Sequence, residues 1–122
     1  MRHLEIKPNT KYIVFNDPHN PSGSLMSEES KQALKALGEQ HDIILFADEV
    51  YRLLELNPSD RSPSMADMTD KGIALGTMAK PFGCGGMCIG WVVCQDKIII
   101  EKLLKAQHLF AVCFSRAGEI QA

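Results

Sequence analysis

Residues 43–51 of the chain read IILFADEVY. Five apolar residues in a row are typical of a strand that is buried on both faces, as in a parallel sheet covered by helices. The run stops at acidic and aromatic residues, of which Asp48 is the first and Tyr51 the last. We therefore predict a central strand over residues 43–47, with polar side chains placed where that strand ends.

Short runs of the same kind lie on both sides of this central strand. Residues 12–15 read YIVF and residues 73–76 read IALG, and both have the length and composition of strands. Residues 88–94 alternate weakly between apolar and polar side chains, and we interpret them as a fourth strand.

Two segments have the periodicity of amphipathic helices. Apolar side chains recur at helical spacing over residues 27–40, and Ser27 precedes two glutamates in the manner of a helix N-cap. Over residues 97–110, Asp96 occupies the corresponding capping position and apolar residues again follow one face. Residues 57–72 are rich in proline, serine and aspartate, and are predicted to form an irregular connection.

The order of the predicted elements indicates the fold class. A helix between the first two strands implies a parallel crossover, so we predict an α/β fold. In sheets of this kind the ligand site lies beyond the carboxyl ends of the strands. The loops that follow the first three strands all lie at that edge.

Length and composition exclude several classes of protein. The 122 residues provide one domain at most, and a hydrophobic content of 45% is enough for a packed core. A formal net charge of −2 gives no basic surplus for nucleic acid, and no apolar run is long enough to cross a membrane. The first residues do not form a secretory signal, so we expect a cytoplasmic protein.

The sequence contains four cysteines, and they are Cys84, Cys88, Cys94 and Cys113. Their spacing lacks the paired C-x2-C elements of common zinc sites, so we predict no metal centre. In a reducing compartment we expect free thiols, and we interpret them as small, mostly buried apolar side chains.

Three motifs follow the first three strands. Residues 18–23 read PHNPSG, residues 48–51 read DEVY, and residues 77–86 read TMAKPFGCGG. Each motif by itself is more often a plain turn, a strand end or a solvated loop than part of a functional site. Their common place at one edge of the sheet is what favours a functional site.

The residue types in these motifs suit one kind of chemistry. A lysine that forms a Schiff base needs an anion nearby, and a pyridine ring used as an electron sink needs a carboxylate at its nitrogen. Lys80 and Asp48 are predicted at the ends of neighbouring strands, where both can face one ring. Asn20 and Tyr51 are able to donate hydrogen bonds to an oxygen on such a ring.

On these motifs the sequence resembles the fold-type I aminotransferases of class I and II, which use pyridoxal 5′-phosphate. Members carry a P-x-N-P-[ST]-G loop, a D-x-x-Y strand end and an S-x-S-K-x-F-G-x-x-G-x-R-x-G-W segment, which reads TMAKPFGCGGMCIGW over residues 77–91 here. The resemblance covers residues 10–122. It implies that residues 1–122 form part of the large, cofactor-binding domain, with a mostly parallel sheet of about four strands and flanking helices.

The resemblance also implies a role for each matching residue. Lys80 is expected to hold pyridoxal 5′-phosphate covalently and to move a proton during the reaction. Asp48 is expected to pair with the pyridine nitrogen, Asn20 and Tyr51 with the phenolic oxygen of the ring, and Thr77 with the phosphate. The implied reaction moves an amino group from an amino acid to a 2-oxo acid, and family members are homodimers.

Two positions depart from the family pattern. Cys88 stands where the family has an arginine that clamps the phosphate, and Ala79 replaces a hydroxyl residue. A thiol cannot make the charged, bidentate contact of a guanidinium, so both changes are expected to weaken phosphate binding. Arg116 matches no family motif, and we interpret it as a surface charge.

Three interpretations of the whole chain remain open, because family members are much longer. The chain is the central piece of a transaminase-type enzyme, or a truncated and catalytically inactive relative that acts as a binding or dimerisation module, or the product of an incomplete gene model. A lyase on the same fold would share Lys80 and Asp48, and the motifs do not specify the amino acid. Because the family's sheet continues beyond these strands, we expect the isolated chain to self-associate.

Overall fold

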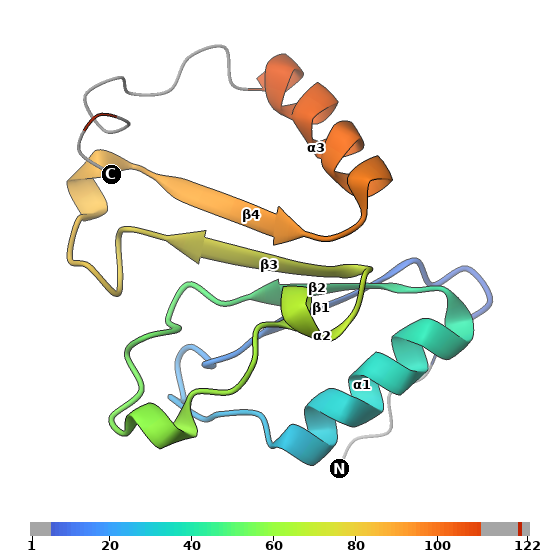
Figure 1. Ribbon diagram of the computed structural model, residues 1–122, viewed down its shortest axis with the longest axis horizontal. Coiled ribbons are helices and arrows are strands. Elements are labelled where there is room, and N and C mark those ends of the chain that lie inside the picture. Colours follow the sequence, from blue (N-terminus) through green and yellow to red (C-terminus); the bar gives the residue numbers. More distant parts are fainter. Residues whose placement is uncertain (1–5, 111–119, 121–122) are drawn as a thin grey trace.

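Four strands form one sheet in the order β1-β2-β3-β4 (Figure 1). The structure is a computed structural model that describes residues 6–110 and residue 120. The strands are β1 (Tyr12–Asn16), β2 (Ile44–Asp48), β3 (Gly72–Thr77) and β4 (Gly90–Cys94). The helices are α1 (Glu28–His41), α2 (Met65–Met68) and α3 (Lys97–Phe110), with single 3-10 turns η1 (Pro58–Asp60) and η2 (Gly85–Met87).

The direction of the strands confirms the predicted α/β class. β1 and β2 are parallel, β2 and β3 are parallel, and β3 and β4 are antiparallel, so the sheet is mostly parallel as expected. The register places Asn16 opposite Asp48, and Asp48 opposite Leu75. The first three strands therefore end at the same edge of the sheet.

Helix α1 forms where the sequence predicts it, with its bounds shifted by one residue. The hydroxyl of Ser27 accepts the Ser30 N–H at 3.2 Å and caps the first turn. The helix ends at Asp42, which adopts a left-handed conformation with φ of 57° and donates its N–H to the Gly38 carbonyl. A Cβ on Gly38 would lie 3.1 Å from Leu45 Cγ, so α1 packs very closely against β2.

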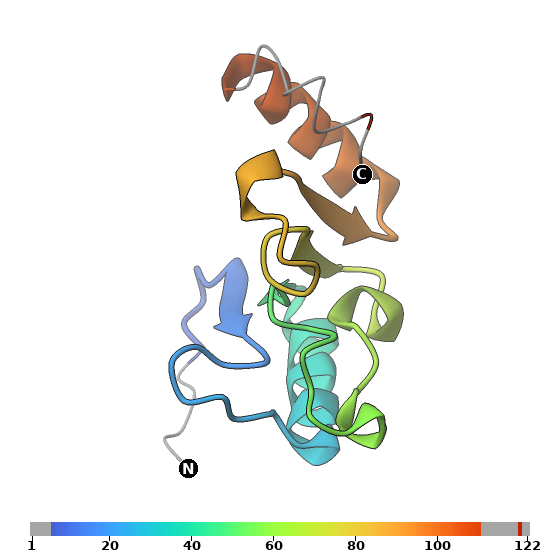
Figure 2. The ribbon, with the colours of Figure 1, turned by 90° about the vertical axis from the view of Figure 1, so that its left-hand side faces the viewer.

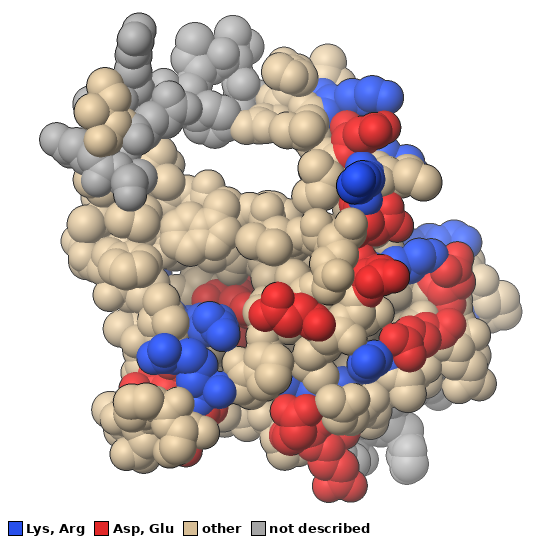
Figure 3. Space-filling model, in the orientation of Figure 1, with Lys and Arg blue, Asp and Glu red and all other residues tan. Residues whose placement is uncertain are grey.

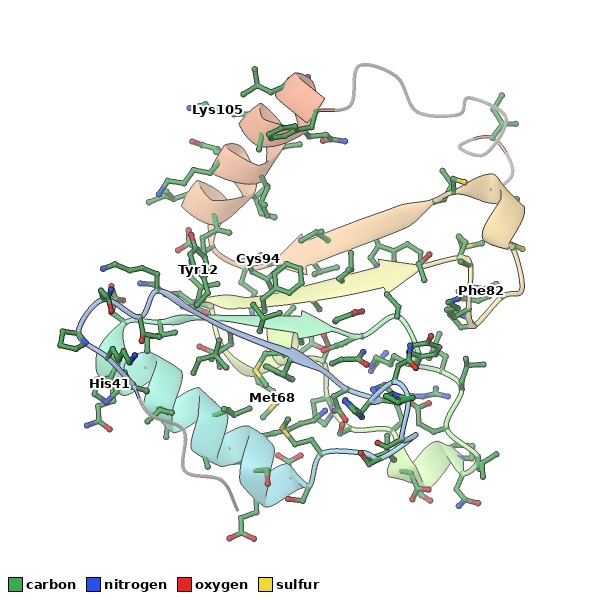
Figure 4. All side chains as sticks on the ribbon, turned by 180° about the vertical axis from the view of Figure 1, so that it is seen from behind. Tyr12, His41, Met68, Phe82, Cys94 and Lys105 are labelled. Atoms are coloured by element: carbon green, nitrogen blue, oxygen red, sulfur yellow. The ribbon has the colours of Figure 1, made fainter. Side chains whose placement is uncertain are left out.

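The hydrophobic core lies between the sheet and the helices α1 and α2 (Figures 1 and 2). Met68, labelled in Figure 4, lies between the sheet and α1 and packs against this core. The buried residues of this core come from α1, β2 and α2, and they are Leu34, Leu45, Ala47 and Met65. Within β2 the alternate residues are only half-buried, so the prediction of a strand buried on both faces was wrong. Helices cover just one face of β2 among the residues that the structure describes.

The connection after β2 is more regular than the sequence predicts. Residues 57–72 contain η1 and α2 instead of an irregular loop. Glu49 explains why α2 forms, because its Oε1 accepts hydrogen bonds from the Met65 N–H at 2.8 Å and from the Ser64 hydroxyl at 3.1 Å. A carboxylate from a distant part of the chain thus supplies an anion at the start of α2, where it suits the helix dipole.

The fourth strand is shorter than predicted. Residues 85–87 form the turn η2 and Cys88 follows it with φ of 54°, so β4 begins only at Gly90. The indole of Trp91 lies against Gly76 of β3, where a Cβ would lie 2.5 Å from two ring atoms. Only glycine leaves room for this contact. The hairpin between β3 and β4 is closed by a tryptophan lying against a glycine on the opposite strand.

The cysteines are less buried than the sequence suggests. Cys88 is exposed, while Cys84 and Cys94 are half-buried, so the interpretation of all of them as mostly buried was wrong. Burial raises the pKa of the Cys94 thiol above its ordinary value. Cys113 and Arg116 lie outside the described residues. None of the described helices has the length and apolar content that crossing a membrane requires.

Candidate active site at the carboxyl ends of the strands

The loops that follow β1, β2 and β3 meet at the left-hand end of the sheet in Figure 1. They carry the residues that the sequence motifs single out. Phe82, labelled in Figure 4, belongs to the loop after β3 and lies at the end of the molecule opposite to His41. The parallel register of the first three strands is the reason that motifs far apart in the sequence come together here.

Asn20 and Tyr51 are in direct contact. The side-chain amide of Asn20 donates a hydrogen bond of 3.1 Å to the Tyr51 hydroxyl, across 31 positions of sequence. Tyr51 is held in a tight turn directly after β2, in which the Arg52 N–H donates to the Glu49 carbonyl at 2.9 Å. Two neutral polar groups thus converge on one point at the edge of the sheet.

Lys80 joins this pair from the loop after β3. Its Nζ lies over the Tyr51 ring, 5.9 Å from the ring centroid, which is within the range of a cation–π contact. No carboxylate of residues 6–110 lies within ion-pair distance of this Nζ. The lysine is exposed.

Asp48 is the last residue of β2 and is half-buried. Its carbonyl accepts two hydrogen bonds from the end of β1, and the next residue, Glu49, donates its N–H to the Leu75 carbonyl of β3 at 3.0 Å. The carboxylate accepts one hydrogen bond, from the Val50 N–H to Oδ1 at 3.2 Å. Within the described part of the chain its Oδ2 has no hydrogen-bond partner, so this oxygen retains capacity to accept one.

Thr77 closes the base of the loop that carries Lys80. Its hydroxyl donates to the Ile89 carbonyl at 3.0 Å and accepts the Ala79 N–H at 3.1 Å. A hydroxyl has a single donor, and here that donor is already used. A phosphate contact from Thr77 therefore requires the bond to Ile89 to be exchanged.

Cys88 follows the turn η2 on the surface. Its thiol lies 3.8 Å from the Gly85 carbonyl oxygen, to which it makes a weak hydrogen bond. The residue is uncharged and solvent-exposed at the position where the sequence motif calls for a guanidinium. The phosphate end of the predicted site thus receives no cation from this position.

A buried ion pair supports the Asn20 loop, and the motifs did not reveal it. Asp17 Oδ2 lies 2.6 Å from Lys31 Nζ, and both side chains are about 95% shielded from solvent. Asp17 also accepts the Met26 N–H at 2.8 Å, and Lys31 donates to Ser62. A signal existed in the sequence, since Lys31 lies three residues before Leu34 on the face of α1 that faces the core.

A cavity of about 440 Å³ opens beside the contact between Asn20 and Tyr51. Its remaining walls are largely apolar and include Leu25, Leu54 and Leu56. Neither Asp48 nor Lys80 lines this space. The cavity therefore borders the contact between Asn20 and Tyr51 and does not reach the other two candidate residues.

Comparison with known proteins adds the family context of this site. A family model described as "Aminotransferase class I and II" matches residues 2–121. Kynurenine–oxoglutarate transaminase 1 of Mus musculus is 32% identical over 122 residues, which cover 89% of this chain and 29% of that protein. Arginine–pyruvate transaminase AruH of Pseudomonas aeruginosa is 36% identical over 89 residues, covering 72% of this chain and 23% of that protein.

Solved structures show the same likeness in three dimensions. A PLP-dependent aminotransferase from Streptococcus suis superimposes with a TM-score of 0.84 and 27% identity, over 94% of this chain and 30% of that one. N-succinyldiaminopimelate aminotransferase from Mycobacterium tuberculosis gives 0.75 and 29% identity, over 85% of this chain and 28% of that one. The chain spans less than a third of the length of these relatives.

Proposed function

Because the chain belongs to the class I and II aminotransferase family, we propose that it binds pyridoxal 5′-phosphate and serves amino-group transfer from an amino acid to a 2-oxo acid. In this proposal residues 1–122 form part of the large domain of such an enzyme. The observation that carries it is the contact of Tyr51 with both Asn20 and Lys80, at the edge of the sheet where β2 ends in Asp48.

The described residues fit the ring of this cofactor. Asp48 Oδ2 is free to accept a hydrogen bond from a protonated pyridine nitrogen, and its charge favours that protonation. Asn20 and Tyr51 place an amide and a hydroxyl together, as binding a phenolic oxygen requires. When bound, the cofactor supplies an electron sink that makes the α-hydrogen of the amino acid acidic.

Lys80 is the residue to which we assign the chemistry. With pyridoxal 5′-phosphate bound, Lys80 would hold its aldehyde carbon covalently through Nζ, with the carbonyl oxygen released as water, until the amine of a substrate replaces it. The freed Nζ would then act as the base and acid that moves the proton of the substrate α-carbon. The Tyr51 ring would help to hold this amine in place, because Nζ lies above its face.

Reductive trapping tests the cofactor assignment. The chain is incubated with pyridoxal 5′-phosphate, reduced with borohydride, digested and analysed by mass spectrometry. We expect the adduct on Lys80 and its loss in Lys80→Ala, while Lys35→Ala, which changes a lysine on the exposed side of α1, retains it. Absence of an adduct on Lys80, or equal labelling of surface lysines, overturns the proposal.

A second candidate function is binding without catalysis, and Cys88 is the observation that favours it. An exposed thiol in place of the phosphate-clamping cation leaves the cofactor poorly anchored. In this case the chain acts as a binding or dimerisation module. Steady transfer of amino groups from a panel of amino acids to 2-oxoglutarate by the 122-residue chain would refute this alternative.

A further inference from the structure

We propose that Asn16 is a positioning residue that fixes Asn20 relative to Asp48. Nothing in the sequence motifs or the family match assigns a role to this side chain. The inference rests on the proposed function only where the cofactor is concerned. The placement itself is a property of the free chain.

The geometry of Asn16 joins the two loops directly. Asn16 is the last residue of β1, and its Oδ1 accepts the Asn20 N–H at 2.6 Å. Its Nδ2 donates to the Asp48 carbonyl at 2.8 Å. The Asn16 amide therefore binds the backbone of two residues. Its oxygen accepts from Asn20, and its nitrogen donates to Asp48.

Asp48 is held firmly by this arrangement. A carbonyl oxygen has two lone pairs, and that of Asp48 accepts both the Asn16 amide and the Asp17 N–H, the latter at 3.1 Å. The end of β1 thus saturates the carbonyl of the residue whose carboxylate is proposed to meet the pyridine nitrogen. A shift at Asn16 is transmitted to Asp48 without an intermediate residue.

Asn16 is also one of the two described residues that hold Asn20 in place. The loop is closed internally by the His19 N–H to Ser24 carbonyl bond of 2.9 Å and the Gly23 N–H to His19 carbonyl bond of 2.7 Å. Neither bond fixes the loop to β2. Among the described residues, Asn20 itself is held by Asn16 through its backbone and by Tyr51 through its side chain.

An asparagine is the side chain that this position requires. Aspartate keeps an acceptor for the Asn20 N–H but has no donor for the Asp48 carbonyl, so it turns an oxygen toward another oxygen. Alanine removes both contacts. Misplacement by about 1 Å in a site of this kind is costly to catalysis, so the loss of either contact is expected to matter.

Amide hydrogen exchange tests the placement on the cofactor-free chain. Asn16→Ala is expected to accelerate exchange of the Asn20 N–H roughly fivefold, the effect of losing one ordinary hydrogen bond. Asn16→Asp, which keeps that acceptor, leaves the Asn20 rate near the wild-type value. The control is Asn57→Ala, which removes an exposed hydrogen bond of 3.1 Å from the Asn57 amide to the Asp60 carboxylate. This variant is expected to leave the exchange rate of the Asn20 N–H unchanged. Equal Asn20 exchange in wild type and Asn16→Ala, at unchanged global stability, overturns the inference.

The absorption spectrum of the bound cofactor gives a second readout. In Asn16→Ala the pH midpoint of the spectral transition is expected to move by about half to one unit, as for one lost hydrogen bond. The shift should largely disappear in the Asn20→Ala background if Asn16 acts through Asn20. An identical midpoint in wild type and Asn16→Ala contradicts the inference. A wild-type chain that binds no cofactor contradicts the proposed function instead, and the exchange rates still decide the placement.

Discussion

Cys88 is the single residue at which this chain departs most clearly from the cofactor site that its family resemblance implies. The residue is exposed in a loop whose other candidate phosphate contact, the Thr77 hydroxyl, already donates to Ile89. The structure thus offers an uncharged surface where a cation would be needed. The backbone of Cys88 is already in the left-handed region, so replacing one side chain by another adds little strain there.

Restoring the cation is expected to strengthen cofactor binding. Cys88→Arg introduces a charged hydrogen-bond donor, worth about 1.5–3 kcal/mol to an anionic partner, so the Kd for pyridoxal 5′-phosphate should fall roughly ten- to hundredfold. Cys84→Arg adds the same charge to the same loop at a position outside the motif and serves as the control. Titrations that show equal gains for both variants would attribute the effect to net charge alone.

Asp42 gives a prediction for pH dependence. The hydrogen bond and charge of Lys71 hold the pKa of this carboxyl below its ordinary value of 3.8. A carboxyl whose pKa is lowered in the folded chain stabilises it above that ordinary value and loses the effect as the pH falls through the folded pKa. Asp42→Asn, which tolerates the left-handed backbone, should therefore lower the free energy of unfolding slightly at pH 7 and leave it unchanged at strongly acidic pH.

The measurement for Asp42 is urea unfolding over a series of pH values. The difference between wild type and Asp42→Asn should shrink as the pH drops below about 4. High salt should reduce it at neutral pH, because the pair is solvent-exposed. A difference that persists in the Lys71→Met background would show that the pairing with Lys71 is not its source.

The sequence motifs place candidate residues at one edge of the sheet, but they do not reveal what supports those residues. The structure has Asn20, Asp48, Tyr51 and Lys80 at or after the carboxyl ends of β1, β2 and β3, and the roles assigned to them stay predictions. Asn16 could not be found in this way. Its partners are backbone groups, and backbone groups carry no signature in a sequence until the strand register is known.

Helix α1 is fixed to the loop after β1 by the buried ion pair of Lys31 and Asp17. Removing one partner of such a pair leaves an uncompensated charge, which costs about 3–5 kcal/mol. Lys31→Met should lower the free energy of unfolding by this amount. Lys35→Met removes a half-exposed lysine on the same helix, whose Nζ lies 3.9 Å from Glu39 Oε1, and should cost less than about 1 kcal/mol. Equal losses in the two variants, measured by urea unfolding, would contradict the argument.

Strand β3 begins against the backbone of α2. A Cβ on Gly72 would lie 2.1 Å from the Met65 carbonyl oxygen and 3.0 Å from that of Thr69, and backbone atoms cannot move aside cheaply. Gly72→Ala is expected to destabilise the chain by about 2–3 kcal/mol, as for other overpacked sites. A Cβ on Gly86 would have no atom within 4 Å, so Gly86→Ala should change the free energy of unfolding by less than about 0.5 kcal/mol. Thermal or urea unfolding distinguishes the two variants. An unchanged free energy of unfolding in Gly72→Ala would show that the backbone of α2 moves aside at low cost.

The two long helices were predictable from periodicity and the strands from their apolar runs, whereas the short helix α2 was not. The helix predicted over 97–110 has the bounds Lys97–Phe110, and Asp96 Oδ1 accepts the Ile98 N–H at 2.8 Å as its cap. By contrast, α2 has four residues, too few to show a period. It is stabilised by Glu49, whose contact with it appears only after the chain has folded.

The whole molecule leaves both edges of its sheet open within the described residues. β1 and β4 are the outer strands, and Tyr12 and Val14 of β1 are 61% and 70% exposed. In the space-filling view, the surface over β4 is uncharged, while Lys, Arg, Asp and Glu gather over α1, α3 and the connection that follows β2 (Figure 3). Trp91 and Val93 are among the exposed side chains of β4.

Open apolar edges lead us to expect self-association of the isolated chain. An unpaired strand edge is a template for pairing with another chain. Light scattering should show a mass that rises with protein concentration, and Val14→Lys should reduce this rise by placing a charge on the edge strand. Ala36→Lys adds the same charge to the exposed side of α1 and should have no such effect. A clean monomer at all concentrations would contradict the expectation.

The contact between Trp91 and Gly76 provides this chain with an intrinsic optical probe. Trp91 is its single tryptophan, and the strand that carries it pairs Gly90 with Thr77 at the base of the Lys80 loop. Indole emission depends on the polarity around the ring, so loosening of this hairpin would shift the fluorescence maximum to longer wavelength. The same emission would be quenched by energy transfer to a chromophore that absorbs in the near ultraviolet. Movement and loading of the lysine loop could therefore be followed in real time, on unlabelled protein.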